Sequence, residues 1–547
     1  MSLLALQGVR KSFGSRLVLD GIDLAVDRGT RIGIVGANGT GKSTLLRLAV
    51  GADTADSGEI VRRRGVVVSL LPQHPLGDER TPLETVVAAR PDLAELDEEL
   101  HAVAARLGEP ELANDLDRMT RVLRRQEDLL ERWEQLGGPS LAGRARAWLS
   151  GFGLTEEELG LPTTALSGGQ RKLIALAACL AQEPDVLLLD EPEAHLDNEG
   201  RALVEELVRG FDGAVLVVSH DRYLLDETIN AVAVLERGQI RVWPGTYSEY
   251  TVARDLELER QKQLYVTQQK EIARLEAAIR RFKDWANRVV DERHARQARV
   301  KQMQIDRMEK VERPVLERKR IGLQLRPKAR GGQRVFELRS LGMAFGEEPV
   351  LAGVELTVMH GERLGVVGEN GAGKSVLLKT VVGALEPTEG EVWVGPSIRV
   401  GYLAQDQETL DPERSPLETV RAARPCTEGE AVSLLMKFLF AYEQVRRPNK
   451  LLSGGERTRL QLLLLMLSGS NLLVLDEPTN HLDIESVEAL EDALERFEGT
   501  VVCISHDRYF LDRIADRILE VRDGGIETTE GGWSDWHRRR GQPAVAA

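Results

Sequence analysis

The sequence predicts an α/β protein in which two homologous domains are joined by a long helical linker. Three observations carry this prediction: a set of motifs occurs twice in the same order, strand-like segments alternate with helical ones in each copy, and a long charged stretch separates the copies. Strands that alternate with helices are typical of parallel sheets. At 547 residues the chain is too long for one core and has room for three or four domain-sized units.

The spacing of five motifs reveals the duplication. GANGTGKS at 36–43 recurs as GENGAGKS at 368–375, and Gln73 recurs as Gln405, both at an offset of 332 residues. LSGGQ at 166–170, the DEP segments and the SHDRY segments recur at an offset of 286, so the first copy holds 46 extra residues. This indicates duplication of a whole domain, because a solenoid repeats every 20–50 residues or so.

The extra residues fall at about 90–150 and carry apolar side chains at helical spacing. The pattern predicts either a helical hairpin that protrudes from the first domain or an enlarged helical subdomain. Its apolar positions are Leu93, Leu96, Leu100, Val103 and Leu107, then Leu112, Leu116, Met119, Leu123, Leu130 and Trp133.

The stretch 251–316 is highly charged and contains no glycine, and its first proline is Pro314. It predicts two long antiparallel helices with a charged tip, with a solvated spacer as the alternative. The apolar positions are Ile272, Leu275, Ile279 and Phe282, then Val300, Met303, Ile305, Met308 and Val311. We therefore expect three parts: a first domain at 1–250, a basic helical-hairpin linker at 251–333 and a second domain at 334–547.

Charge and composition exclude several classes of protein. Three scattered cysteines do not form an iron–sulfur or zinc module and suggest a reducing, cytoplasmic setting. No apolar run reaches the roughly 18 residues that span a bilayer, and no amino-terminal signal is visible. The net charge is −15, but 251–334 holds 23 Lys and Arg against 12 Asp and Glu. A basic segment on an acidic body suggests an anionic partner for that segment.

Each copy of GxxxxGKS follows a strand-like run and precedes a helical one, which is the context of a phosphate-binding loop. Backbone N–H groups of such a loop surround the phosphates, Lys42 or Lys374 adds a positive charge, and Ser43 or Ser375 offers an oxygen to Mg²⁺. The predicted loop residues are Gly36, Ala37, Asn38, Gly39, Thr40, Gly41, Lys42, Ser43 and Thr44 in the first copy and Gly368, Glu369, Asn370, Gly371, Ala372, Gly373, Lys374, Ser375 and Val376 in the second.

Further polar residues sit where apolar strands end. Phosphoryl transfer needs charge neutralisation, positioning and an oriented water, which the Asp-Glu pairs, the two glutamines and the two histidines could supply. One such residue alone would be an ordinary surface residue, but the whole set occurs twice. The predicted catalytic residues are Glu191, Glu477, His220, His506, Gln73 and Gln405. The predicted metal ligands are Ser43, Gln73, Asp190, Ser375, Gln405 and Asp476.

These motifs, in this order, resemble the ATP-binding cassette ATPases, so the implied fold is two P-loop NTPase domains and the implied cofactors are ATP and Mg²⁺. In that family the LSGG segment caps the γ-phosphate of ATP held by the opposite cassette. One site would join 36–43 to Ser453–Gly455, and the other would join 368–375 to Ser167–Gly169. The implied signature residues are Ser167, Gly168, Gly169, Gln170, Ser453, Gly454, Gly455 and Glu456. The resemblance also puts Phe13 and Phe345 against adenine, with a core position as the alternative.

The tandem cassettes, a joining helical pair of about 80 residues and the NHLD text after the second DEP resemble the ABC-F family of ribosome-associated ATPases. In that family the joining helices reach toward the peptidyl-transferase region and P-site tRNA, and an insert like 90–150, the arm, reaches toward the E-site side. The resemblance covers essentially the whole chain. It is strong in the cassettes and only architectural in the arm.

The linker sequence is independently suited to rRNA and tRNA, because basic residues with a nearby aromatic can contact phosphates and bases. The candidate RNA-binding residues are Arg288, Arg293, Arg296, Arg299, Lys301 and Arg307. We expect a monomer with intramolecular cassette pairing that binds the ribosome with ATP and regulates translation. The alternatives are the ATPase subunit of a membrane transporter supplied by another chain and a ribosome-protection protein of antibiotic resistance.

The two copies differ after their shared DEP text. The first reads DEPEAHLD and the second DEPTNHLD, so Glu193 and Ala194 stand where Thr479 and Asn480 stand later. The residue after the loop serine also differs, Thr44 against Val376. Both Asp-Glu pairs are intact, which predicts hydrolysis at both sites. The differences indicate either unequal rates or neutral drift.

Overall fold

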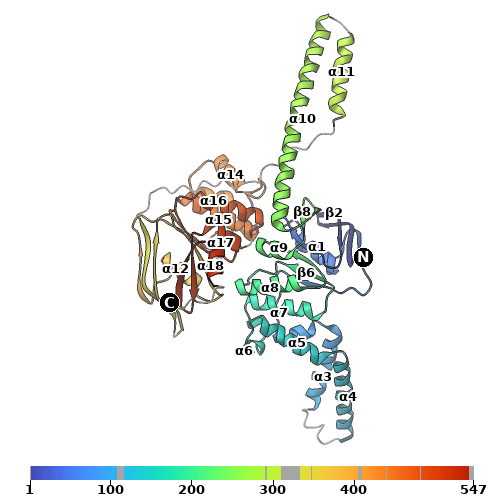
Figure 1. Ribbon diagram of the computed structural model, residues 1–547, viewed down its shortest axis with the longest axis vertical. Helices are drawn as coiled ribbons and strands as arrows, with labels where there is room; N and C mark the ends of the chain where they lie inside the picture. The colour runs from blue at the N-terminus through green and yellow to red at the C-terminus, as the bar shows by residue number, and fades with distance from the viewer. Residues whose placement is uncertain are drawn as a thin grey trace. The chain divides into compact units, whose positions relative to one another are not determined.

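The computed structural model describes residues 2–107, 116–289, 292–308, 333–346, 348–404, 410–438, 440–480 and 482–540. The described elements form two compact units (Figure 1). The first unit contains both halves of the duplication, and the second contains α10 (Tyr247–Val289) and α11 (Glu292–Asp306). No helix of the described residues is long and apolar enough to cross a membrane.

Each half is built around a six-stranded sheet, and the strand order is the same in both: β5-β6-β7-β3-β8-β9 and β14-β15-β16-β12-β17-β18. Five neighbouring strands are parallel and the last is antiparallel. The strands are β3 (Arg31–Val35), β5 (Val68–Leu71), β6 (Val186–Asp190), β7 (Ala214–Val218), β8 (Ala231–Glu236), β9 (Gln239–Pro244), β12 (Arg363–Val367), β14 (Val400–Leu403), β15 (Leu472–Asp476), β16 (Thr500–Ile504), β17 (Arg517–Arg522) and β18 (Gly525–Glu530). The predicted duplicated α/β class is confirmed.

Each half also has a three-stranded antiparallel sheet, which the sequence reasoning did not anticipate. The strand orders are β2-β1-β4 and β11-β10-β13. The strands are β1 (Leu4–Phe13), β2 (Arg16–Val26), β4 (Ser57–Arg62), β10 (Arg334–Phe345), β11 (Glu348–Met359) and β13 (Glu389–Val394). Their buried residues pack with those of the parallel sheet and the first helix into one core per half.

The central strands explain why the polar residues come together. All five residues of β6 and all five of β15 are buried, as expected for parallel strands covered on both faces. Carboxyl ends of parallel strands lie at one edge of a sheet, which in this fold class is the edge where ligands bind. Asp190 and Asp476 are the last residues of β6 and β15.

The helices of the first half are α1 (Lys42–Val50), α2 (Pro82–Ala88), α3 (Pro91–Leu107), α4 (Leu116–Gln135), α5 (Gly138–Gly151), α6 (Glu156–Leu159), α7 (Gly168–Ala181), α8 (Asn198–Gly210) and α9 (Arg222–Thr228), with the 3₁₀ turn η2 (Thr163–Ala165). Those of the second half are α12 (Lys374–Val381), α13 (Pro416–Ala423), α14 (Glu428–Lys437), α15 (Gly454–Ser468), α16 (Ile484–Glu495), α17 (Arg508–Ile514) and α18 (Trp533–Arg540), with η3 (Asn449–Leu451).

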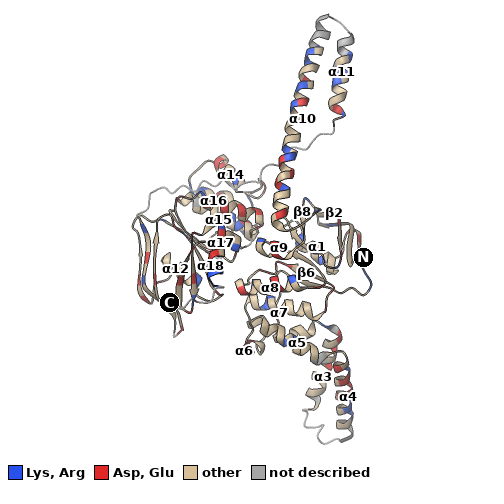
Figure 2. Ribbon diagram, in the orientation of Figure 1, with Lys and Arg blue, Asp and Glu red and all other residues tan. Residues whose placement is uncertain are grey.

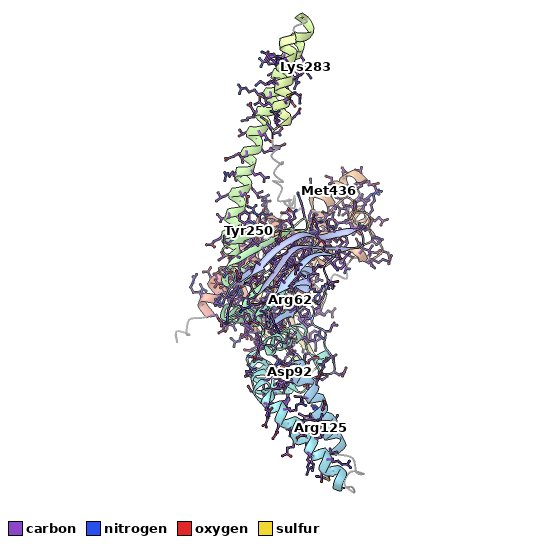
Figure 3. The ribbon with its side chains drawn as sticks, turned by 90° about the vertical axis from the view of Figure 1, so that its right-hand side faces the viewer. Arg62, Asp92, Arg125, Tyr250, Lys283 and Met436 are labelled. Atoms are coloured by element: carbon purple, nitrogen blue, oxygen red, sulfur yellow. The ribbon has the colours of Figure 1, made fainter. Side chains whose placement is uncertain are left out.

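The insertion contains a helical hairpin of α3 and α4, which lie side by side (Figure 1). Arg125 of α4, labelled in Figure 3, forms an ion pair with Glu99 of α3 at 2.5 Å. The predicted apolar face of α3 is confirmed at Leu96 and Val103, which are buried. Leu93 is buried too, but in the body of the cassette.

The predicted apolar face of α4 is confirmed at Trp133 and wrong at three other positions. Met119, Leu123 and Leu130 are all at least 37% exposed. The face that packs against α3 contains Leu129, which is fully buried, with Val122 and the predicted Trp133 beside it. The two stripes are neighbours on one helix, so apolar spacing alone did not distinguish them. Leu112 lies outside the described residues.

The linker unit is a pair of unequal helices. α10 has 43 residues and α11 has 15, and the two pack against each other. Leu275 and Ile279 of α10 are buried as predicted. On α11, however, Val300 and Met303 are 58% and 55% exposed, so the predicted second apolar stripe is not the packed face there.

Leu129→Ala should destabilise the arm hairpin by about 2–5 kcal/mol, because it removes a fully buried leucine from a small cluster. Leu130→Ala is a matched control, since its neighbouring side chain is 42% exposed. Amide hydrogen exchange over α3 and α4 measures the effect. Equal exchange rates in the two variants would contradict the assigned packing.

Candidate active sites

The phosphate-binding loops have the same geometry in both halves. Lys42 Nζ donates to the carbonyls of Gly36 at 2.7 Å and Ala37 at 3.2 Å, and Lys374 Nζ donates to the equivalent carbonyls at 2.6 and 2.9 Å. Gly41 has φ of 106°, and a Cβ there would lie 2.5 Å from the Val18 side chain. Glycine is therefore required at this position, because the backbone is left-handed and a side chain would collide with Val18.

The first helices begin directly after these loops and lack a side-chain cap. α1 starts at Lys42 and α12 at Lys374. The capping positions are Gly41 and Gly373, which have a left-handed backbone and no side chain that could cap the helix. The initial N–H groups of a helix have no intrahelical partner and carry partial positive charge, so an uncapped start favours a bound anion. Burial lowers the pKa of both lysines, and nearby carboxylates partly offset that effect.

The structure brings two predicted metal ligands of the first site together. The Ser43 side chain hydrogen-bonds to the Asp190 carboxylate, whose pKa is raised by burial. Asp190 Oδ1 is buried and has no hydrogen-bond partner among the described residues. In the second half, Asp476 is likewise buried at the end of β15.

The glutamates that follow have a strained backbone. Glu191 has φ of 47° and Glu477 has φ of 49°, in a region that side-chain-bearing residues rarely adopt. Hydrogen bonds from their N–H groups to Val218 O at 2.8 Å and Ile504 O at 3.0 Å hold this geometry. Strain of this kind clusters at functional sites, where it aims a side chain. Burial raises the pKa of Glu477 to about 7, although Arg201 and Lys374 act in the opposite direction.

The predicted histidines face these glutamates. His220 Nε2 lies 3.7 Å from Glu191 Oε1, and His506 Nε2 lies 3.5 Å from Glu477 Oε1. Burial lowers the pKa of His220 to about 4 and holds the pKa of His506 well below its ordinary value. Both rings are therefore neutral at physiological pH, and each can donate one ring N–H to a phosphate oxygen.

The LSGG segments form the starts of α7 and α15 through capping boxes. Ser167 Oγ accepts from Gln170 N at 3.2 Å, and Gln170 Oε1 accepts from Ser167 N at 3.0 Å. Ser453 and Glu456 repeat this arrangement. The side chains of Gln170 and Glu456 are thus engaged in capping, and the exposed start of the helix offers Ser-Gly-Gly to a ligand.

A cavity of about 540 Å³ joins residues of both halves. It is lined by Lys42, Ser43, Gln73, Glu191 and His220 from the first half and by Ser453, Gly454 and Gly455 from the second. The cavity therefore combines one phosphate-binding loop with the opposite LSGG segment, the combination that the cassette resemblance implies. Asn38 N also donates to Asp483 Oδ2 at 3.3 Å across the same boundary.

The second pairing is represented by Asn370 Nδ2, which donates to the carbonyl of His195 at 3.4 Å. His195 in turn lies beside Gly168 of the first LSGG segment. Gln405, expected near this site, lies outside the described residues.

Phe13 and Phe345 are surface residues. They are 48% and 53% exposed, which excludes the core position that the sequence left open. Phe13 lines the cavity, and the Lys11 ammonium lies over its ring, 5.5 Å from the centroid. Of the residues that follow the loop serines, Thr44 is buried and lines the cavity, and Val376 is partly buried.

Sequence reasoning missed the arginines of the two SHDRY segments, although their repetition was visible. Arg222 pairs with Glu491 of α16, and Arg508 pairs with Glu205 of α8 at 2.8 Å. All four side chains are buried, and each pair joins one half to the other. It also missed Lys172, a fully buried lysine in the apolar text of α7.

The residues fit a nucleotide with its divalent cation. The uncapped loop helix and the unpartnered Asp190 Oδ1 beside Ser43 are suited to phosphate and Mg²⁺, respectively. The described residues contain no group of three or more His, Cys, Asp or Glu that could hold a metal by themselves.

Residues 19–194 and 351–480 match a family described as ABC transporter, and residues 233–324 match a second family with that description. The putative ATP-binding protein YdiF of Bacillus subtilis (strain 168) is 34% identical over 545 residues, which cover 99% of this chain and 83% of that protein. ABC transporter F family member 5 of Arabidopsis thaliana is 33% identical over 534 residues, which cover 97% of this chain and 76% of that protein.

Among solved structures, the archaeal ribosome recycling factor aABCE1, in its complex with the ribosomal stalk protein aP1, is similar with a TM-score of 0.60. The match covers 97% of this chain and 92% of that chain at 19% identity, so it concerns the fold.

The fold, the repeated sites and these matches define a protein with two ATP-binding cassettes, which implies ATP binding and hydrolysis. Within that class the full-length relatives are F family members, and the chain belongs to the ABC-F family.

Phe13→Ala should weaken ATP binding at the first site about tenfold, because stacking of a base on an aromatic ring is worth about 1–3 kcal/mol. Titration with ATP in a Lys374→Ala background isolates that site. Leu17→Ala is the control, since Leu17 is 52% exposed nearby and does not line the cavity. The same affinity in both variants would argue against adenine stacking on Phe13.

Proposed function

We propose that this protein hydrolyses ATP at two composite sites and, in its ATP-bound state, binds the ribosome in the cytoplasm and regulates translation. Membership of the ABC-F family together with an exposed basic linker carries this proposal. The linker would contact rRNA and tRNA near the peptidyl-transferase region, as the family resemblance implies.

In the proposed reaction, the loop at 36–43 and Ser453–Gly455 hold one ATP, and the loop at 368–375 and Ser167–Gly169 hold the other. Glu191 and Glu477 orient the attacking water, and a pKa near the working pH suits Glu477 to accept its proton. His220 and His506 donate to the γ-phosphate as neutral rings. Mg²⁺, which would neutralise phosphate charge, would be held by Ser43, Gln73 and Asp190 in one site and by Ser375, Gln405 and Asp476 in the other.

The basic residues of the linker favour an RNA partner. Arg296 and Arg299 of α11 and Arg307 just after it are exposed, and Lys301 is half-buried with its Nζ 3.3 Å from Gln304 Oε1. Figure 2 shows Lys and Arg recurring along both helices of the linker. The side chains of Arg288 and Arg293 lie outside the described residues. Exposed guanidinium groups suit phosphate contacts.

The double variant Glu191→Gln/Glu477→Gln should bind ATP without hydrolysing it and accumulate on ribosomes. Sedimentation through a sucrose cushion measures this, with ADP in place of ATP as the control. Parallel flotation with membrane vesicles tests the alternative, an ATPase subunit of a transporter. Recovery of the variant with vesicles, or in the ribosome-free supernatant with ATP, would refute the proposed ribosomal role.

Reversing the described linker arginines, as Arg296→Glu/Arg299→Glu/Arg307→Glu, should weaken ribosome binding at least tenfold and reduce its salt dependence, because about three phosphate contacts are lost. Arg10→Glu/Arg28→Glu/Arg522→Glu is a control with the same change in charge, on cassette positions that are at least 60% exposed. ATP affinity should be unchanged in both. Equal ribosome binding by the two triple variants would rule out a specific role for α11.

A further inference from the structure

Two buried cations of the first half interact electrostatically with Glu193, which in turn accepts a hydrogen bond from the backbone of His220. Lys172 on α7, Glu193 after β6 and Arg201 on α8 are all buried or nearly so. At the equivalent positions, 286 residues later, the second half has Thr458, Thr479 and Val487. Three uncharged positions of the second copy are therefore charged in the first, and Arg201 also donates to the carbonyl of His506 at 2.9 Å.

Glu193 holds the backbone segment that carries this histidine. Its Oε1 accepts from the Ser219 hydroxyl at 2.7 Å and from His220 N at 2.9 Å. The Ser219 hydroxyl in turn accepts from Asp221 N at 2.9 Å. Ser219 is fully buried, and Glu193 is 8% exposed. A carboxylate that accepts two hydrogen bonds in the interior holds its donors more firmly than a neutral oxygen would.

In the second half, different residues hold the backbone of the equivalent histidine, His506. Thr479 Oγ1 meets Ser505 Oγ at 3.1 Å, and the N–H of His506 donates to the catalytic candidate Glu477, at 3.4 Å. In the first half the equivalent N–H, that of His220, donates to Glu193 and not to the catalytic candidate Glu191. The Glu191 side chain is accordingly 21% exposed, whereas the Glu477 side chain is 7% exposed.

Lys172 links the same charge to the glutamine loop. Its Nζ donates to the carbonyls of Pro72 at 3.1 Å, Gln73 at 2.8 Å and Asp190 at 3.1 Å. Among the acidic groups that attract this ammonium, Glu193 contributes most. The other charged or titratable groups that face Glu193 are Glu191 after β6, Arg201 from α8, and His220 and Asp221 after β7.

We propose that Glu193 is a positioning residue of the first ATP site, which fixes His220 through its backbone and makes hydrolysis at this site depend on pH through a carboxyl group that the second site, with Thr479 in its place, lacks. This inference rests on the proposed ATP hydrolysis. Glu193 lines the cavity of the first site, and its proposed action is on His220, through the hydrogen bond from the His220 N–H. Its deprotonated form accepts both hydrogen bonds strongly, and protonation weakens them.

The direction of the pH effect follows from burial. Burial and the nearby Asp221 and Glu191 carboxylates raise the pKa of Glu193 to about 7. Hydrolysis at the first site therefore falls as pH drops through about 7. The pKa of this carboxyl group is 4.5 in the unfolded chain and about 7 in the folded protein. Stability therefore falls as pH rises from about 4.5 to about 7, and the loss is complete above pH 7.

The test compares the wild-type protein with Glu193→Gln, which keeps the shape and removes the titration. We expect ATP turnover of Glu193→Gln to be several-fold lower at pH 8 and the difference to vanish below pH 6, with ATP affinity unchanged within twofold. The midpoint of thermal unfolding should be higher for Glu193→Gln at pH 8 and equal at pH 5. A purely structural role would not combine lower turnover with higher stability. Glu227→Gln on the surface of α9 is the control.

The outcomes separate two failures. If the wild-type protein hydrolyses no ATP, the proposed function fails and takes this inference with it. If it does hydrolyse ATP and Glu193→Gln follows the wild-type pH profile, only the inference is overturned. Should Glu193→Gln not fold, Glu193→Thr carries the residue of the second copy, and its pH profile decides in the same way.

Discussion

Both sites depend on the burial of charge at the carboxyl edge of a parallel sheet. Burial is the largest cause of the pKa shifts of Lys42, Asp190, Glu477 and His506, and it acts against the charged form of each. Of these groups Lys42 gains most from a polyphosphate, because little water competes with it and opposite charges attract strongly in a medium of low dielectric constant. The sheet makes this possible, since β6 and β15 are buried along their whole length and deliver their last residues to one edge.

The duplication has kept backbone geometry more strictly than side-chain chemistry. The strand order, the left-handed glutamates at φ of 47° and 49° and the buried arginine pairs between the halves recur in both copies. The side chains behind the histidines do not. A chain folded from two copies of one domain can thus keep the frame that an ATP sandwich requires and still change how firmly each histidine is held.

Much of the fold was predictable because each motif is a short sequence segment with a strand before it and a helix after it. The parallel sheets, the phosphate-binding loops and the strand-end acids followed from that. The antiparallel sheets were missed, since no motif marks them. The packed face of α4 was predicted correctly at Trp133 but misassigned at Met119, Leu123 and Leu130, because two apolar stripes run side by side. The capping boxes of Ser167–Gln170 and Ser453–Glu456 were readable as S-x-x-Q and S-x-x-E. Lys172 had no readable signal, because a single lysine in an apolar helix is ordinarily a solvent-facing residue.

The three hydrogen bonds of Lys172 also bear on how the first sheet assembles. β5 has only four residues and pairs with β6 across the whole insertion, with Val68 opposite Val186. A slip of two residues would keep every side chain on its own face, so the apolar pattern does not forbid it. It would move the carbonyls of Pro72 and Gln73 by about 7 Å, beyond the reach of the ammonium, while Asp190 stayed in place. The lysine therefore favours one register of β5 against β6, because only that alignment of these distant strands satisfies all of its donors.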